Sequence, residues 1–199
     1  MNKSELRNFL NKHPLKELSI ASLSDFKFRI LLNDDFNNEV GKMTGGLMPT
    51  ERLAEEKETA KAIEAIRTPE DLMLQMRKPA EFSNMTALVK KALEMEDDAL
   101  PLIVARYRKA KHEFFIENAS RIFSRADKKY VEELRDCYKD IWHPHAQALA
   151  CLLFGYLKLI DTIPLLLSEY ERFRRLYPDE TYDQCPLLAL EYLWDEMTE

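Results

Sequence analysis

A tyrosine recurs along the second half of this chain at an almost constant interval, and this spacing constrains the fold more than any other feature. The intervals are 31 and 32 residues, and each tyrosine follows an aliphatic residue by seven positions. The tyrosines are Tyr107, Tyr138 and Tyr170, and the aliphatic residues are Leu100, Val131 and Ile163. A period of this length is typical of stacked helix pairs, because one helical hairpin cannot bury its own apolar face. The spacing therefore predicts an all-α fold, a short right-handed α–α superhelix of stacked helix pairs.

The scarcity of glycine supports the same fold. The chain has only 4 glycines in 199 residues, with 46% hydrophobic and 32% charged residues. Tight β-hairpins, most β architectures and Gly-rich phosphate loops need more glycine than this. We therefore expect helices throughout, with enough apolar residues for a sizeable core.

The remaining glycines predict how the chain is divided. Three of the four fall between residues 41 and 49, which indicates a loop. We expect a helical N-terminal extension with this loop over 1–49, and a helical repeat domain over 50–199. Within that domain we expect a degenerate repeat at 68–97 and three further repeats at 98–126, 127–160 and 161–197.

Several residues predict where helices begin. Thr68 stands before a proline and three residues before Asp71, the pattern of a capped helix start. One aspartate in each of the three later repeats stands where an N-cap belongs: Asp98, Asp127 and Asp161. Two prolines are expected in first turns, where the missing N–H costs nothing: Pro101 and Pro164.

The apolar pattern predicts one continuous core. The segment 147–156 is apolar around the whole helical circumference, which is typical of a helix buried on several sides. The leucines and isoleucine expected in the core are Leu102, Ile103, Leu149, Leu152, Leu153, Leu166, Leu167 and Leu190.

Residues 68–197 resemble the HEAT-repeat and HEAT-like α-solenoids of the armadillo superfamily. The resemblance rests on the prolines of the first and third repeats, the aliphatic residues around them, and small residues in the second helices at Ala119, Ala148 and Ala189. The second repeat departs from the pattern, with Glu132 in place of the proline. The resemblance implies a scaffold that presents a concave surface to a protein or nucleic acid, and it supplies no catalytic residue.

On this basis the chain is expected to be a non-enzymatic protein-interaction or scaffold module. The segment 99–131 carries eight Lys and Arg against three acids, a local balance of +5. The residues predicted to bind a partner are Arg121, Arg125, Lys128 and Lys129. The alternative is a nucleic-acid-binding or DNA-repair protein that uses the basic region 106–129, although the net charge of −6 weighs against it.

The C-terminal segment has the opposite charge. Residues 176–199 hold seven acids and no Lys or Arg. The first interpretation is a polar cap on the last repeat. The second is an inhibitory or immunity-type partner that binds a basic protein through these acids.

The remaining candidate chemistry is sparse. Trp142 is the first residue of a Trp-His-Pro-His sequence, which could be taken for a metal site. Histidines two apart across a proline do not share a helix face, which argues against that site. We therefore expect a loop between paired helices, with the Trp142 indole packed over the joint between them. The cysteines are Cys137, Cys151 and Cys185, without metal-ligand spacing. The sequence therefore predicts no catalytic residue, cofactor or metal, reduced thiols in a cytoplasmic protein, and no membrane partner.

Overall fold

The structure is a computed structural model, and it describes residues 1–16, 49–80 and 82–198. These residues form ten α-helices and two short 3₁₀-helices, with no β-strand among them, so the predicted all-α class is confirmed. The α-helices are α1 (Lys3–Lys12), α4 (Thr50–Glu64), α5 (Pro69–Gln75), α6 (Phe82–Glu94), α7 (Glu96–Tyr107), α8 (Glu113–Phe123), α9 (Lys129–Asp136), α10 (Pro144–Tyr156), α11 (Ile163–Leu176) and α12 (Gln184–Glu196). The 3₁₀-helices are η1 (Tyr138–Asp140) and η2 (Ile160–Thr162).

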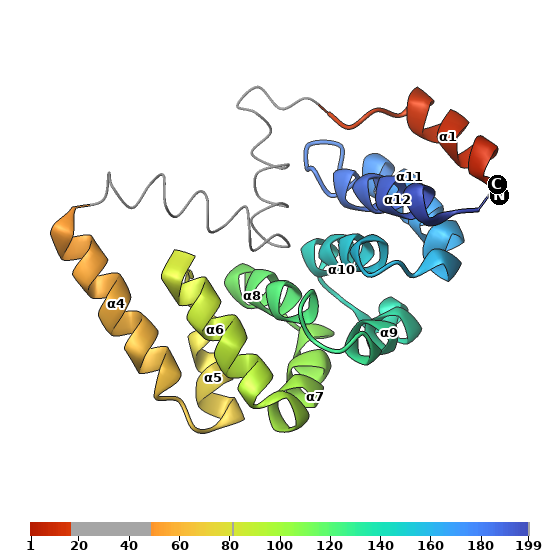
Figure 1. Cartoon of the computed structure of the whole chain (residues 1–199). Coiled ribbons are helices and arrows are strands. Elements are labelled where there is room, and N and C mark those ends of the chain that lie inside the picture. Colours follow the sequence, from red (N-terminus) through yellow and green to blue (C-terminus); the bar gives the residue numbers. More distant parts are fainter. Residues whose placement is uncertain (17–48, 81, 199) are drawn as a thin grey trace.

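Alternate helices pack against one another. Helices α6, α8, α10 and α12 contact each other in that order, and α5, α7 and α9 do the same beside them. Helix α4 packs on α6 at one end, and α1 packs on α12 at the other. Figure 1 shows this succession as an arc that runs from α4 to α1. The right-handed superhelix and its HEAT-like character stay predictions.

The N-terminal helix closes one end of this succession. Leu6 of α1 is fully buried, and the Trp194 indole of α12 donates a hydrogen bond to the Lys3 carbonyl at 3.1 Å. The first helix and the last therefore lie side by side (Figure 1). The predicted loop at 41–49 falls almost entirely outside the described residues.

One of the predicted helix starts is confirmed. The Thr68 hydroxyl accepts from the Asp71 amide at 3.2 Å, at the start of α5. Asp127 is not the predicted cap, because Lys128 is the N-cap of α9, although Asp127 Oδ1 accepts from the Lys129 amide at 2.9 Å. Both contacts satisfy amides that have no partner inside the helix.

Other predicted starts are wrong. Helix α7 begins at Glu96, so Asp98 is its third residue rather than its cap, and Pro101 is its sixth rather than a first-turn residue. The acids from Glu96 onward favour the positive end of the helix dipole, which explains the extra turn. Asp161 lies in η2 and pairs with Arg135 at 3.0 Å instead of capping α11.

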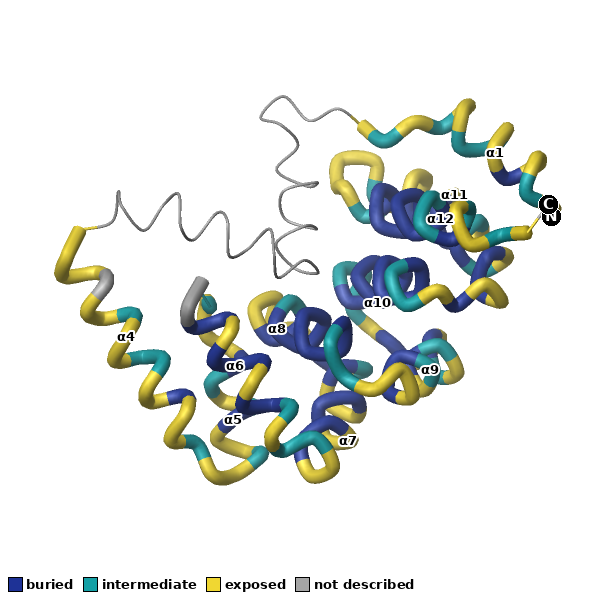
Figure 2. Tube along the Cα trace, viewed as in Figure 1, coloured by how far each residue is buried: buried dark blue, intermediate teal, exposed yellow. Residues whose placement is uncertain are grey.

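The buried side chains form one core along the arc (Figure 2). In α10 the residues from Ala148 to Gly155 are all buried, as its all-round apolar sequence predicts. Of the eight predicted core residues, Leu167 is only half-buried and Leu102 is wrong, because its side chain is 42% exposed. Leu102 precedes the buried Ile103 by one position, about 100° around the helix, and so faces outward.

Candidate functional site

The repeated tyrosines occupy equivalent positions in the structure. The Tyr107 hydroxyl donates to the Ala146 carbonyl at 2.9 Å and lies 3.0 Å from Ser120 Oγ. The Tyr138 hydroxyl lies 3.3 Å from Cys151 Sγ, and in both pairs the partner follows the tyrosine by 13 residues. Each of these tyrosines thus joins its own helix pair from the inside, so the period has a structural cause.

The third tyrosine has the N-terminal segment as its partner. The Tyr170 hydroxyl lies 3.1 Å from His13 Nδ1, and the residue 13 positions later, Asp183, pairs with Lys16 at 3.2 Å. Residues 13–16 therefore cover the end of the last helix pair, α11 and α12.

A polar network lies beneath the second tyrosine. The Tyr138 hydroxyl donates to buried Glu169 at 2.8 Å, and Arg172 Nε donates to the same carboxylate oxygen at 2.8 Å. Arg172 also donates to Gln147 at 2.6 Å. Burial raises the pKa of the Tyr138 phenol and of the Cys151 thiol, so both groups are neutral at physiological pH. This network fixes α10 against α11 and holds no activated nucleophile.

The two histidines of the Trp-His-Pro-His sequence have separate roles. His143 is the N-cap of α10, and its Nδ1 accepts from the His145 amide at 3.3 Å. His145 Nε2 lies 3.5 Å from Glu117, which brings the first turn of α10 close to the second turn of α8. Among the described residues, no group of three or more His, Cys, Asp and Glu side chains could hold a metal ion.

The tryptophan of this sequence is exposed, so the prediction that it packs over the joint is wrong. Trp142 has 65% of its surface exposed, although its amide donates to the Arg108 carbonyl at 3.0 Å. Phe114, in the first turn of the neighbouring α8, is 43% exposed. We call His112, Phe114, Trp142 and His143, at the N-terminal ends of α8 and α10, the aromatic edge. Three of these rings are exposed and His143 is half-buried.

The residues predicted to bind a partner do not share one exposed face. Arg121 is buried, 6% exposed, and donates to Asn118 at 2.7 Å. Asn118 in turn donates to the carbonyls that follow α5, so this arginine lies inside the joint between α5 and α8. Arg125 is half-buried and donates to the Arg121 carbonyl, whereas Lys128 and Lys129 are exposed.

The acidic C-terminal segment is also divided. Asp179 and Glu180 are exposed before α12, Asp195 is exposed near its end, and Glu196 there pairs with Lys158 at 2.9 Å. Helix α12 has 13 residues, about 20 Å, so these acids lie at its two ends rather than on one patch.

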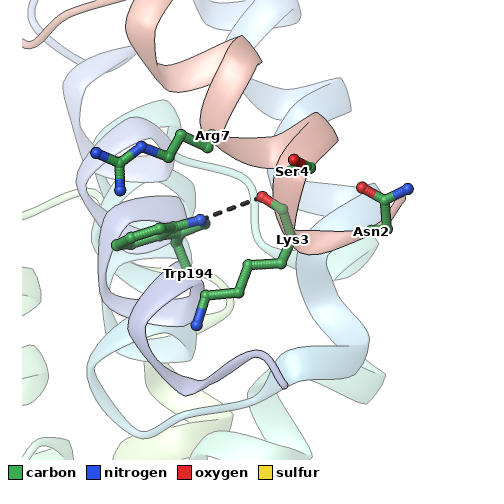
Figure 3. A pocket seen from close by; sticks show the side chains of 5 residues that line it. All are labelled: Asn2, Lys3, Ser4, Arg7 and Trp194. Atoms are coloured by element: carbon green, nitrogen blue, oxygen red, sulfur yellow. Dashed lines mark hydrogen bonds between the residues drawn. The ribbon is translucent and has the colours of Figure 1, made fainter. Parts of the chain in front are cut away.

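An open pocket, not predicted from the sequence, lies where α1 meets α12, and Figure 3 shows the side chains that line it. In the part of the chain that the structure describes, no helix is long and apolar enough to cross a membrane. The chain matches no protein-family model, no curated protein and no solved structure.

Proposed function

We propose that this chain is a non-enzymatic protein-interaction module, and that it binds its partner through the aromatic edge. The observation that carries the proposal is the 65% exposure of Trp142 on a backbone held by a hydrogen bond to the preceding helix pair. Tryptophan is enriched among the few residues that dominate protein interfaces, because it combines a large apolar surface with an N–H donor.

The local structure favours binding at this edge. Pro144 fixes the chain directly after His143, and the cap on α10 holds the loop that carries the indole. A ring on a pre-ordered loop loses little conformational freedom when a partner covers it, so more of the burial energy remains as affinity. Phe114, in the first turn of α8, is a second exposed aromatic residue of the aromatic edge.

The distribution of cations supports a protein partner over nucleic acid. Lys109 and Lys111 are exposed before α8, and Lys128 and Lys129 are exposed after it. Helix α8 has 11 residues, about 16 Å, which separates the two groups. Continuous backbone recognition needs cations that follow one groove. Lys128 and Lys129 are exposed at the far end of α8 and are proposed as further contacts, whereas Arg121 is buried and cannot contact a partner.

The succession of helix pairs supports a HEAT-like scaffold, as proposed from the sequence. The two contacting series, α5–α7–α9 and α6–α8–α10–α12, are what such a scaffold requires. We place the proposed contact at the aromatic edge rather than on the concave face, because the exposed aromatic residues lie there.

The experiment is a comparison of three immobilised proteins in lysate from the source organism. Wild type, Trp142→Ala and the matched control Ile160→Ala are incubated under identical conditions, and retained proteins are quantified by mass spectrometry. Ile160 is 45% exposed in η2, away from the aromatic edge. We expect a protein that wild type and Ile160→Ala retain and Trp142→Ala loses, with direct binding then measured by calorimetry. Equal retention by all three proteins would refute the proposed site.

A further inference from the structure

Helix α10 is capped by an imidazole, and this cap works only while the ring is neutral. His143 has extended backbone directly before the helix, and its Nδ1 accepts from the His145 amide at 3.3 Å. Most helices are capped instead by Ser, Thr, Asn or Asp, whose side chains accept through oxygen. Both nitrogens of a protonated imidazole are donors. A charged His143 therefore cannot accept from this amide, whichever way its ring turns.

The positive charge itself is also unfavourable at this position. The N-terminal end of α10 carries the positive end of the helix dipole, and its first turn contains no acid. Burial lowers the pKa of the His143 imidazole, and His145 lowers it further, whereas Glu113 at the start of α8 raises it. Protonation therefore costs the folded protein a hydrogen bond and adds a repulsion between the charge and the helix dipole.

The acids around this cap are mostly held by other groups. Glu117 of α8 pairs with His145 at 3.5 Å, and Asp140 of η1 pairs with Arg108 at 2.6 Å. Glu113 is exposed, so water weakens its attraction for a charged imidazole. The surrounding acids therefore offset only part of the cost of protonation.

The other titratable groups of the adjacent elements do not offset it either. The loop 109–112 before α8 holds two lysines and a histidine, all exposed, and their positive charges repel a protonated His143. Tyr182, before α12, packs on the His145 ring with the centroids 6.0 Å apart. Burial raises the pKa of the Tyr182 phenol, which is therefore neutral at physiological pH. On α11, Arg172 pairs with a buried carboxylate.

The loop that this cap holds is the one that carries Trp142. Two further hydrogen bonds hold the loop: the Trp142 amide donates to the Arg108 carbonyl at 3.0 Å, and Gln147 Nε2 donates to the Ile141 carbonyl at 2.7 Å. Neither of these bonds changes with pH near neutrality, because backbone and amide groups do not titrate there. The imidazole cap is thus the part of this support that acid removes.

We propose that protonation of His143 loosens the loop that carries Trp142, so that mild acid weakens binding at the aromatic edge. The effect on binding rests on the proposed function, whereas the change in the loop occurs in the protein alone. A pre-ordered loop favours affinity because little conformational freedom is lost on binding, and a loosened loop loses this advantage. The loss of one N-cap corresponds to an affinity about fivefold weaker.

The first test measures the loop without a partner. Hydrogen exchange of the Trp142 and His145 amides is followed by NMR in the full-length protein at pH 7 and pH 5, and each rate is compared with that of an unstructured chain at the same pH. In wild type, the protection of both amides should fall about fivefold at pH 5. The matched control is the Asp71 amide, which is capped by the Thr68 hydroxyl and should keep its protection.

Two variants separate the cap from other effects of acid. His143→Asn keeps a cap that does not titrate, so its Trp142 amide should be equally protected at both pH values. His143→Ala has no capping side chain and should show the low protection at pH 7 already. Unchanged protection of the wild-type Trp142 amide at pH 5, or an equal fall in wild type and His143→Asn, would overturn the proposal.

The second test concerns binding. The capture experiment is repeated at pH 7 and pH 5 with wild type and His143→Asn, and the protein that Trp142→Ala loses is quantified. Wild type should retain less of it at pH 5, and His143→Asn should retain the same amount at both pH values. Equal retention by wild type at the two pH values would contradict the control of binding by acid. If no protein depends on Trp142 even at pH 7, the proposed function fails, and the exchange measurement still decides whether His143 controls the loop.

Discussion

The closest approach between α10 and α12 gives the sharpest stability prediction, for the substitution Gly155→Ala. A Cβ atom at residue 155 would lie 2.3 Å from Ala189 Cα, 2.5 Å from its Cβ and 2.6 Å from its carbonyl oxygen. Two of these three atoms belong to the backbone of α12. No change of side-chain rotamer relieves these two backbone contacts, so the two helices must move apart.

The expected loss is the difference between two effects. Replacing glycine by alanine inside a helix favours folding by about 1 kcal/mol. Overpacking a core costs about 1–3 kcal/mol and occasionally more, and contact with backbone places this site at the upper end. We therefore expect Gly155→Ala to lower the free energy of unfolding by about 2 kcal/mol or more.

The assay is urea unfolding at 25 °C, followed by circular dichroism. Ala105→Gly, at an exposed position of α7, measures the propensity effect alone and should cost about 1 kcal/mol. Ala189→Gly combined with Gly155→Ala should restore only part of the loss, because the Cα and carbonyl contacts remain. Gly155→Ala as stable as wild type, or more stable, would refute the close packing of α10 on α12.

Three further predictions concern single side chains. Leu153→Ala should lower the free energy of unfolding by about 2–5 kcal/mol in chemical denaturation, because Leu153 is fully buried. Leu102→Ala should lower it by less than about 1 kcal/mol, because Leu102 is exposed. Equal losses of stability in the two variants would contradict the burial pattern. Tyr138→Phe should cost about 1–3 kcal/mol in the same assay, since buried Glu169 loses a donor; an unchanged midpoint would contradict this. Burial lowers the pKa of the His143 imidazole, and the neighbouring His145 lowers it further. The imidazole is therefore protonated at a higher pH in the unfolded chain than in the folded chain, and stability falls as pH drops below about 6.5. His143→Asn keeps a capping side chain but removes this titrating group. The melting temperature of His143→Asn should therefore fall less than that of wild type between pH 7 and pH 5. Parallel curves of melting temperature against pH would contradict this.

The fold could largely be predicted because local patterns determine it. The tyrosine period, the apolar run of α10 and the Thr68 cap depend on spacing within one or two helices, and each appears in the structure. The packing of α1 on α12 could not be predicted, because it joins residues about 190 positions apart and leaves no periodic signal. Lys3 and Arg7 are four residues apart on α1, but only the structure places the Trp194 ring against both side chains (Figure 3).

The candidate site was harder to predict because exposure depends on neighbouring helices. Counting charges treats every arginine as a surface group, yet Arg121 lies in the buried run 118–123 of α8. Its neighbours Asn118 and Ser120 are small or polar residues that fit a close joint, and this was the available signal. Trp142 presents the opposite case, a large apolar residue that the adjacent loop leaves uncovered.

The most direct test of the interaction proposal is photo-crosslinking in the source organism. A benzophenone amino acid replaces Trp142 in one strain and Ile160 in a second, and crosslinked products are compared after irradiation. Our account predicts a discrete product at position 142, containing one other protein, that is absent at position 160. Products that are identical at the two positions, or a product at position 160 alone, would contradict it.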